Sequence, residues 1–354
     1  MPSLSDRFRG LLLGTAVGDA IGLPAEGISR ARAGRMFKGH LRHRFLGPYG
    51  MISDDTEHTL FVAQCLLAHP ASQERFGARL GWCMRWWFAA LPAGVGLATA
   101  RACMKLWIGF GFRSSGVCSA GNGPAMRVAL IGAFFAESPD KMASYTSVST
   151  RLTHTHPAAL IGARAIAATA AWIVRDSLVQ RPAPSVFCAM LKDLAPDDPT
   201  WCDLVAKMEG ALLDDVTVDE FASRIGLLPE VTGYIYHTVP VALYAWHKHL
   251  GDFRASVSAV VKCGGDTDTT GSIVGALAGL TVGESGIPSD WIQNIKDWPR
   301  STHLLRRVAD RLTELKEGGS PGVVRYPWLG IVPRNAFFLL VVLLHGFRRL
   351  LPPY

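Results

Sequence analysis

Apolar residues recur at three- and four-residue intervals over most of this chain, and strict alternation of apolar and polar residues is rare. Because that spacing places apolar side chains on one face of an α-helix, the pattern predicts helices and few strands. Gly, Pro, Asp and Ser residues separate the apolar segments and mark their ends. The fold class that follows is all-α. The predicted helices cover residues 6–22, 54–69, 74–90, 124–137, 140–152, 157–179, 203–213, 217–224, 231–249, 252–262, 268–280 and 302–316.

Two of these predicted helices share an unusual glycine spacing. Residues four apart lie on the same face of a helix, and each glycine costs about 1 kcal/mol relative to alanine inside one. Close approach of two helix backbones is a gain that offsets this cost. We therefore expect the two helices to cross tightly and to bring together the acidic segments at their ends. The glycines are Gly10, Gly14, Gly18 and Gly22 in one helix, and Gly271, Gly275 and Gly279 in the other.

Composition and charge narrow the class of protein. The chain has 354 residues, of which 49% are hydrophobic and 18% charged, so an ordered globular protein is expected. Its seven cysteines include no CxxC pair, which favours reduced thiols in the cytoplasm over disulfides or a zinc site. Asp19 interrupts the apolar run near the N-terminus, which favours a helix over a secretion signal. The net charge of +7 comes without any nucleic-acid-binding motif, so no nucleic-acid partner is expected.

Two short acidic runs stand directly before apolar segments. One is "SDDT" at residues 53–56, and the other lies within "GGDTDTTG". Aspartate near a helix N-terminus is ordinary capping, but each run holds more carboxylates and hydroxyls than capping needs. If the two helix starts meet, the carboxylates repel one another unless cations lie among them. Oxygen ligands of this kind suit Mg²⁺ or Mn²⁺, so we predict a pair of divalent cations. The carboxylates are those of Asp54, Asp55, Asp266 and Asp268.

Six segments, taken in order, resemble the successive motifs of the ADP-ribosylglycohydrolase family, which includes the dinitrogenase-reductase-activating glycohydrolases. The resemblance runs from about residue 6 to 280. It implies a compact, single-domain, multi-helix orthogonal bundle with a dinuclear Mg²⁺ or Mn²⁺ centre in a cleft. It also implies a hydrolase that removes ADP-ribose from modified protein side chains. The segments are "LLLGTAVGDAIGLPAE", "SDDT", "GNGPAMR", "LTHTHPAALIGA", "GYIYHTVPVALYAW" and "CGGDTDTTGSIVGALAG".

The resemblance also implies roles for individual residues. Glu26, in a Pro- and Gly-containing loop, would lie beside the metals, where it gates the cleft or acts on the leaving group. Asp55 and Asp268 are the candidates for relaying a proton. This chain has Ser53 where many members have threonine, and serine keeps the coordinating oxygen. The implied metal ligands are Ser53, Asp54, Asp55, Asp266, Asp268 and Thr269.

Further motif residues are candidates for binding the substrate. Glycines before a helix that begins at a proline let a diphosphate approach backbone N–H groups, which predicts such a role for Gly121, Asn122 and Gly123 ahead of Pro124. The family resemblance implies that His154 lies near the ribose and phosphates. It also implies that Tyr234 stacks on adenine, although an aromatic residue at helical spacing is more often part of a core.

The expected substrate is an ADP-ribosylated protein linked through an arginine N-glycosidic bond, and free ADP-ribose is the expected product. Serine- and O-acetyl-linked ADP-ribose remain alternatives. A non-catalytic ADP-ribose-binding protein and an immunity protein that blocks an ADP-ribosylating toxin are rivals from other classes. All four metal aspartates are present, which argues against the non-catalytic reading.

The C-terminal segment lies outside the resemblance. We expect a domain over residues 1–318 and a tail over 319–354, beginning near "EGGSPG". From residue 296 onward there are ten Lys or Arg and four Asp or Glu, and the apolar run from Ala336 to Leu344 is too short to span a bilayer. The tail is interpreted as a final packed helix, as a membrane-surface attachment or as a contact for a protein partner. The protein is expected to be a cytoplasmic monomer, with membrane association through the tail as the alternative.

Overall fold

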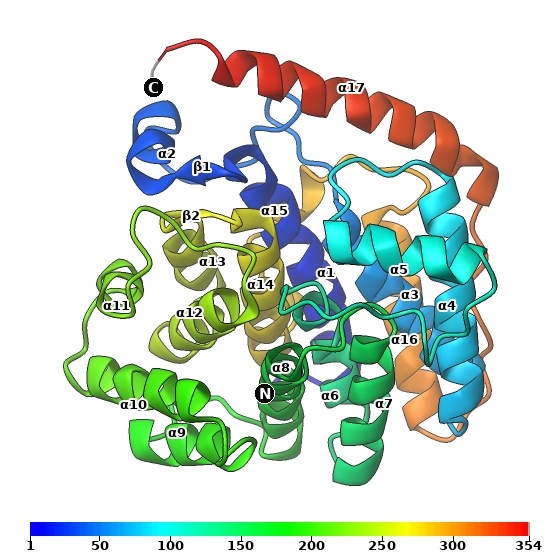
Figure 1. The fold of residues 1–354 in the computed structure, drawn as a ribbon, viewed down its shortest axis with the longest axis horizontal. Coiled ribbons are helices and arrows are strands. Elements are labelled where there is room, and N and C mark those ends of the chain that lie inside the picture. The colour runs from blue at the N-terminus through cyan, green and yellow to red at the C-terminus, as the bar shows by residue number, and fades with distance from the viewer. Residues whose placement is uncertain (353–354) are drawn as a thin grey trace.

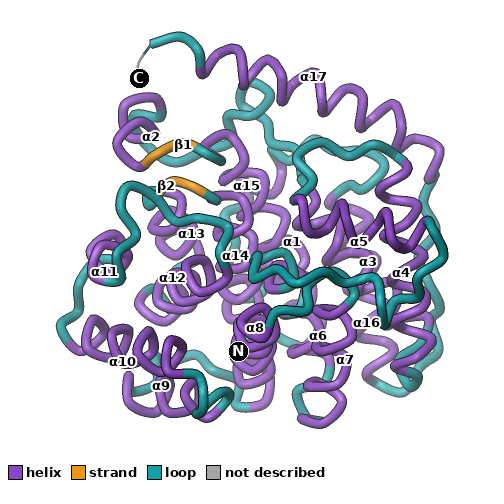
Figure 2. Tube along the Cα trace, viewed as in Figure 1, coloured by secondary structure: helices purple, strands orange, loops and turns teal. Residues whose placement is uncertain are grey.

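The computed structural model describes residues 1–352, and helices make up almost all of its regular structure (Figures 1 and 2). The α-helices are α1 (Leu4–Gly22), α2 (Arg30–Met36), α3 (Asp54–Ala68), α4 (Gln73–Ala89), α5 (Leu97–Trp107), α6 (Ala129–Phe134), α7 (Pro139–Arg151), α8 (Pro157–Arg175), α9 (Pro184–Asp193), α10 (Pro199–Leu213), α11 (Val218–Arg224), α12 (Ile235–Lys248), α13 (Phe253–Val261), α14 (Thr267–Val282), α15 (Ser289–Gln293), α16 (Thr302–Lys316) and α17 (Ile331–Arg349). The all-α prediction is confirmed.

Helices α1 and α14 form the centre of the fold and run antiparallel with their backbones in direct contact (Figure 1). A Cβ added at Gly10 would lie 2.1 Å from the carbonyl oxygen of Gly279, and one added at Gly14 would lie 2.1 Å from that of Gly275. Gly18 faces Gly271 in the same way. The predicted tight crossing of the two glycine-lined helices is therefore what the structure shows.

The antiparallel pairing decides which helix ends meet. A Cβ at Gly22, the last residue of α1, would lie 2.2 Å from the carbonyl oxygen of Thr267, the first residue of α14. The loop that follows α1 and carries Glu26 is thus held against the start of α14. The glycine spacing in the sequence places one acidic segment beside another at this end of the pair.

A short antiparallel pair of strands, β1 (Ile28–Ser29) and β2 (Gly264–Gly265), reinforces this junction (Figure 2). Ile28 pairs with Gly265, and the backbone N–H of Gly27 donates to the Gly265 carbonyl at 2.8 Å. Gly265 has a φ of +80°, and a Cβ there would lie 2.0 Å from the Val231 carbonyl oxygen. Only glycine fits this position, which lies directly before Asp266.

Several helices were not predicted from the pattern. They are short or have little apolar periodicity: α2 buries only Ala33, and α9 follows a Pro-containing segment. The predicted helix at 124–137 is divided, because a 3₁₀ turn at Ala125–Arg127 precedes α6. The unpredicted helices are α2, α5, α9 and α15, whereas α17 corresponds to the final helix that was one interpretation of the tail.

Helix α17 runs along one edge of the molecule and ends near α2 (Figure 1). Its inner face packs on a small apolar cluster separate from the main core, made by Leu23, Phe45, Met51, Phe338 and Val341. The interpretation of the tail as a final packed helix therefore holds for the inner face of α17.

Candidate active site and metal centre

The two acidic runs of the sequence meet at the N-termini of α3 and α14. Ser53 is the N-cap residue of α3, and Asp266 is that of α14. The Thr269 hydroxyl donates to Oδ2 of Asp55 at 3.3 Å, and the Ser53 hydroxyl donates to the same oxygen at 3.3 Å. Residues more than 200 positions apart in the sequence thus share one carboxylate oxygen.

The remaining predicted acidic residues join this cluster. The charges of Glu26, Asp266 and Asp55 all act on Asp268, and Glu26 also acts on Asp54. Ser53 and Asp268 are buried, whereas Glu26, Asp54 and Asp266 are half-buried. All seven residues proposed as metal ligands or catalytic groups therefore lie in one neighbourhood, drawn from the α1–β1 loop and from the starts of α3 and α14.

Burial makes this neighbourhood costly for negative charge. Desolvation is the main cause that raises the pKa of Asp54, Asp55 and Asp268 well above the ordinary value, and repulsion between the carboxylates raises it further. The pKa of Glu26 is raised to about 7, first by burial and then by Asp266, against the opposing charge of Arg349.

The donors suit hard divalent cations. Every donor is a carboxylate or hydroxyl oxygen, and Oδ1 of Asp55 is buried without a hydrogen-bond partner among residues 1–352. Across residues 1–352, no three His, Cys, Asp or Glu side chains are arranged so that they could hold a metal ion as they stand. The oxygen donors therefore fit the predicted cations by their chemistry, whereas the described side chains do not form a closed site.

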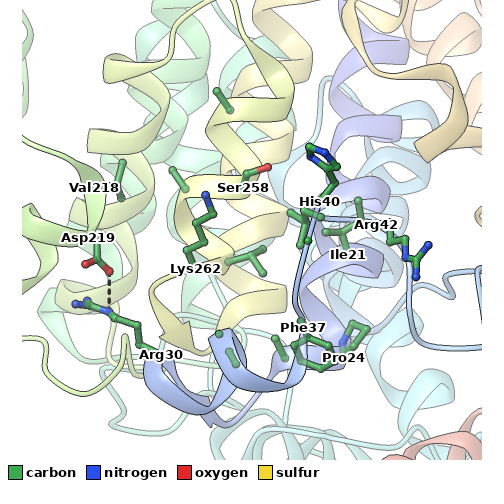
Figure 3. Close-up of a pocket in the computed structure, with 18 of the residues that line it drawn as sticks. Ile21, Pro24, Arg30, Phe37, His40, Arg42, Val218, Asp219, Ser258 and Lys262 are labelled. Atoms are coloured by element: carbon green, nitrogen blue, oxygen red, sulfur yellow. Dashed lines mark ion pairs between the residues drawn. The ribbon is translucent and has the colours of Figure 1, made fainter.

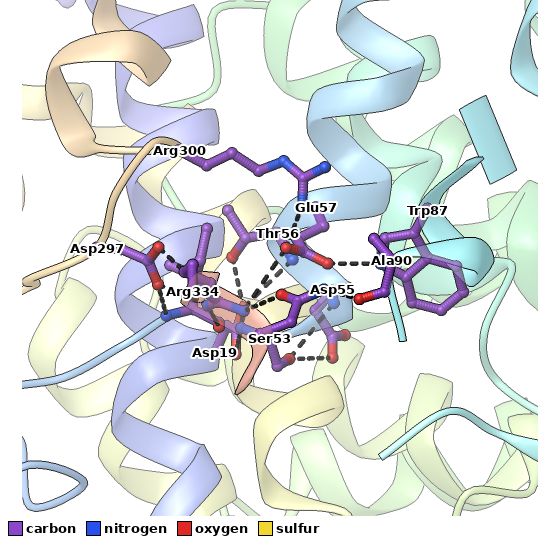
Figure 4. Close-up of polar contacts among 12 residues, drawn as sticks. Asp19, Ser53, Asp55, Thr56, Glu57, Trp87, Ala90, Asp297, Arg300 and Arg334 are labelled. Atoms are coloured by element: carbon purple, nitrogen blue, oxygen red, sulfur yellow. Dashed lines mark hydrogen bonds and ion pairs between the residues drawn. The ribbon is translucent and has the colours of Figure 1, made fainter. Parts of the chain in front are cut away.

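Asp19 supports the start of α3 and was not predicted as a functional residue. Its carboxylate is fully buried on α1 and accepts hydrogen bonds from the backbone N–H groups of Ser53 (2.9 Å) and Thr56 (3.2 Å) and from the Thr56 hydroxyl (2.5 Å) (Figure 4). Burial raises its pKa to about 6. A charged residue inside an apolar glycine-lined helix was the available signal for such a role.

A second set of buried charges lies beneath the same helix. Glu57, on α3, pairs with Arg300 and accepts a hydrogen bond from Nε1 of Trp87 at 2.5 Å (Figure 4). Arg334, on α17, pairs with Asp297 at 2.6 Å and donates to the backbone carbonyl of Ile52. This network joins α17 to the segment that carries Ser53, although the two are far apart in the sequence.

The predicted diphosphate-binding loop lies beside the acidic cluster. Nδ2 of Asn122 donates to Oδ2 of Asp266 at 2.7 Å and to the Thr238 hydroxyl at 2.9 Å. The expectation of an α-helix starting at Pro124 is wrong, because the Asn122 carbonyl accepts the Ala125 N–H at 2.7 Å and closes a 3₁₀ turn instead. Asn122 thus links the loop directly to the start of α14.

His154 lies under this loop. A Cβ added at Gly121 would lie 3.0 Å from its Nε2, and one added at Gly123 would lie 3.3 Å from its Cε1. Nδ1 of His154 hydrogen-bonds with the Thr153 hydroxyl at 2.8 Å, and burial lowers the pKa of the imidazole to about 3. At neutral pH the ring is therefore uncharged.

Arg127 holds the loop at residues 121–123 in place. It lies in the "GNGPAMR" motif, but no role was predicted for it. Its guanidinium is fully buried and donates to the Gly123 carbonyl at 3.2 Å, to the Ser149 carbonyl at 2.8 Å and to the Thr153 hydroxyl at 2.7 Å. Because it binds Gly123 and the hydroxyl that contacts His154, it sets the positions of both.

Tyr234 stands next to the loop with its ring partly in solvent. It pairs through the backbone with Gly121 and is 38% exposed, so the side chain is not a core residue. His237 meets the ring edge-on with centroids 4.9 Å apart. An aromatic face remains accessible at the edge of the site.

A cavity of about 740 Å³ lies on another side of the Glu26 loop (Figure 3). It is lined by Ile21 near the end of α1, by Pro24 and Ala25 of that loop, by residues of α2, α11 and α13, and by Lys262 directly after α13, and it includes the Arg30–Asp219 ion pair. None of the proposed metal ligands lines it, so the chemistry of the acidic cluster, rather than cavity size, identifies the candidate site.

Comparisons with known proteins identify the family. The sequence model of the family described as ADP-ribosylglycohydrolase matches residues 1–321. The chain is 25% identical to the ADP-ribosyl-[dinitrogen reductase] glycohydrolase of Rhodospirillum rubrum, over 89% of this chain and 98% of that protein. It is 26% identical to the ADP-ribosylhydrolase ARH3 of Xenopus tropicalis, over 84% of this chain and 95% of that protein.

A solved structure is similar over nearly the same extent. The structure titled "ADP-ribosylglycohydrolase-related protein complex" superposes with a TM-score of 0.68 at 26% identity and covers 89% of this chain and all of that one. Since the family match spans most of the chain and the fold agrees, the chain belongs to the ADP-ribosylglycohydrolase family.

Proposed function

We propose that the chain is a metal-dependent hydrolase that removes ADP-ribose from modified protein side chains. The observation that carries this proposal is the meeting of the α3 and α14 N-termini, where Asp55 shares hydrogen bonds with Ser53 and Thr269 and faces Asp266 and Asp268. Family membership supports the reaction class.

Two divalent cations, Mg²⁺ or Mn²⁺, are the proposed cofactors. When bound, the cations would neutralise the carboxylates and lower the pKa of a water molecule so that it can attack the substrate at neutral pH. The unpartnered, buried Oδ1 of Asp55 and the raised pKa of its neighbours support this assignment. The proposed ligands are Ser53, Asp54, Asp55, Asp266, Asp268 and Thr269.

The chain's own residues supply the proton transfers. Asp268 or Asp55 would take the proton of the attacking water, which adds to the anomeric carbon as the bond to the protein side chain breaks. Glu26 faces this group from the opposite loop and is placed either to gate the cleft or to act on the leaving group. Because no Asp or Glu occurs between Glu74 and Glu137, that region supplies no catalytic carboxylate. The proposed catalytic residues are therefore Glu26, Asp55 and Asp268.

The loop at residues 121–123 and its neighbours form the proposed ADP-ribose site. Glycine lets a diphosphate approach the backbone closely, and the uncharged His154 beneath the loop can donate or accept a hydrogen bond. The accessible ring of Tyr234 supports stacking on adenine. Asn122, which contacts both Asp266 and the loop, would join the nucleotide end of the ligand to the reacting end.

An arginine N-glycoside is the proposed linkage. The tyrosine motif around Tyr234 resembles that of the bacterial glycohydrolases, which favours this substrate over serine- or O-acetyl-linked ADP-ribose. The three linkages share the ADP-ribose moiety and differ only in the leaving group, so discrimination among them would lie near Glu26.

The test is release of free ADP-ribose from purified substrates carrying arginine, serine or acetyl linkages. We expect turnover of the arginine substrate with Mg²⁺ or Mn²⁺ and loss of turnover in Asp268→Ala. Asp290→Ala is the matched control, because Asp290 is an exposed aspartate paired with Arg254 at the surface. It should retain the activity of the unmodified chain.

Normal turnover by Asp268→Ala would show the proposed mechanism to be wrong. Binding of ADP-ribose without release from any of the three substrates would instead identify a non-catalytic ADP-ribose-binding protein. Protection against an ADP-ribosylating toxin that persists in Asp268→Ala would identify an immunity protein acting by physical blocking.

A further inference from the structure

The outer face of α17 is apolar along its whole length and exposed. Its large side chains are between 44% (Leu339) and 65% (Phe347) exposed, and no charged residue interrupts them between Arg334 and Arg348. A soluble monomeric protein seldom exposes a continuous apolar face of this extent. The exposed apolar residues of the helix are Val332, Phe337, Leu339, Leu340, Leu343, Leu344 and Phe347.

The inner face of α17 ties the helix to the domain, so the helix does not cross a membrane in this fold. Arg334 pairs with Asp297, and Nδ2 of Asn335 donates to the Ala90 carbonyl at 2.8 Å. Nε2 of His345 forms a hydrogen bond with the Phe45 carbonyl at 2.7 Å. The expectation that the tail is too short to span a bilayer does not hold by length, because Trp328–Arg349 has the length and apolar composition of a membrane span and 28% of its most apolar 18-residue window is buried. Helix α17 is therefore placed to lie on a surface rather than to span one.

A basic cavity opens at the C-terminal end of this apolar face. It has a volume of about 460 Å³ and is lined by no Asp or Glu. Within residues 1–352, none of its four arginines forms an ion pair with a carboxylate. Pro24, Phe37 and Arg42 line both this cavity and the one in Figure 3, so the two adjoin beneath α2. The four arginines are Arg42, Arg44, Arg348 and Arg349.

The excess of positive over negative charge in the chain comes from two segments. Residues 27–53 and 318–354 together contain ten Lys or Arg and no Asp or Glu, whereas the rest of the chain contains 26 Lys or Arg and 29 Asp or Glu. The two basic segments lie against each other through α17: Phe45 packs with Phe338, and Arg32 donates to the Arg349 carbonyl. The rest of the molecule is slightly acidic, so the excess belongs to one face.

We infer that this face docks on membranes containing anionic phospholipids, with the apolar side of α17 entering the boundary between head groups and acyl chains and the arginine-lined cavity taking a lipid phosphate. An apolar helix face bordered by unpaired basic residues is the arrangement that binds such surfaces. Charge complementarity selects an anionic lipid surface over a neutral one. The inference concerns binding alone and does not depend on the proposed hydrolysis.

The experiment is flotation of the full chain with two kinds of vesicle, phosphatidylcholine alone and phosphatidylcholine mixed with phosphatidylglycerol. We expect the chain to float with the mixed vesicles and to stay soluble with the neutral ones, and we expect salt to release it. The double variant Leu340→Glu with Leu344→Glu should reduce the bound fraction about tenfold or more, because it places charge in the apolar boundary. Arg42→Glu with Arg348→Glu should abolish the preference for the anionic vesicles.

The matched control is Val186→Glu with Leu213→Glu, which adds the same charge at exposed apolar positions on α9 and α10. It should float like the unmodified chain. Thermal unfolding of each variant should match that of the unmodified chain, since all the altered side chains are exposed.

Three results would overturn the inference. The chain could stay soluble with both vesicles, or the Leu340 and Leu344 variant could float as well as the control. Sedimentation could also show a dimer that this variant dissociates, in which case a second copy of the chain covers α17.

Discussion

Replacing Gly18 by alanine tests whether the contact of α1 with α14 builds the site. A Cβ at this position would lie 1.9 Å from the Gly271 carbonyl oxygen and 3.0 Å from the Ser272 nitrogen. The obstructing atoms are backbone atoms within a helix, so no side-chain rotation can relieve the overlap. The two helices must separate locally.

The magnitude follows from the distances. Reaching an ordinary carbon–oxygen contact requires a separation of about 1.5 Å at this turn. Overpacking of this kind costs roughly 1–3 kcal/mol, and the backbone obstruction places Gly18→Ala at the upper end. Alanine regains about 1 kcal/mol of helix propensity over glycine. The expected net loss in the free energy of unfolding is about 2 kcal/mol.

The assay is urea unfolding followed by circular dichroism, with Mn²⁺ binding as a second readout. Gly210→Ala is the control, because Gly210 lies inside α10 and a Cβ there would have no heavy atom within 4 Å. That variant should be more stable than the unmodified chain by about 0.5–1 kcal/mol. Gly18→Ala should also weaken Mn²⁺ binding, because Gly271 lies one turn beyond Asp268 on α14.

The reasoning would be refuted if Gly18→Ala were as stable as Gly210→Ala, since the direct backbone contact would then not constrain the pair. A stable Gly18→Ala protein with unchanged Mn²⁺ affinity would show that the acidic cluster does not depend on the close approach of α1 and α14.

Three further predictions concern buried polar groups. Arg334→Ala should lower the free energy of unfolding by about 3–5 kcal/mol in urea because it leaves buried carboxylates unpaired, whereas Arg113→Ala, which breaks an exposed pair, should change it by less than about 1 kcal/mol. Asp19→Asn should lose about 1–3 kcal/mol in the same assay because an amide cannot accept all the hydrogen bonds of the carboxylate. Burial lowers the pKa of His247 to about 4, below its unfolded value of about 6.5, so its contribution to stability is lost as pH falls through that interval; His247→Gln should flatten the decline in melting temperature measured from pH 7 to pH 4.

The sequence predicted the helices whose residue pattern is periodic. Gly14 and Gly275 belong to two separate series of glycines, each with four-residue spacing. The close contact of the two helices follows from that spacing and from the cost of glycine in a helix. The helices that begin with "SDDT" and "DTDT" were likewise predicted, together with the meeting of their N-termini. Helix α2 could not be predicted because one buried residue sets no periodicity.

Contacts made by single residues far apart in the sequence were not predictable. Asp19 signals only that a charge interrupts an apolar helix, and its partner Thr56 becomes evident only once α1 and α3 are packed together. The same holds for Arg334, whose partner Asp297 lies on a segment without regular structure. Arg349 contacts the Glu26 loop through the Pro24 carbonyl, and nothing in the local sequence of α17 indicates that contact.

The central claim is that Asp54, Asp55, Asp266 and Asp268 form one pocket whose charge divalent cations neutralise. Equilibrium binding of Mn²⁺, counted by electron paramagnetic resonance, tests it most directly. The account predicts two bound ions per chain, loss of binding in Asp55→Asn and unchanged binding in the surface variant Asp290→Asn. Two bound ions in Asp55→Asn, or no binding by the unmodified chain, would contradict it.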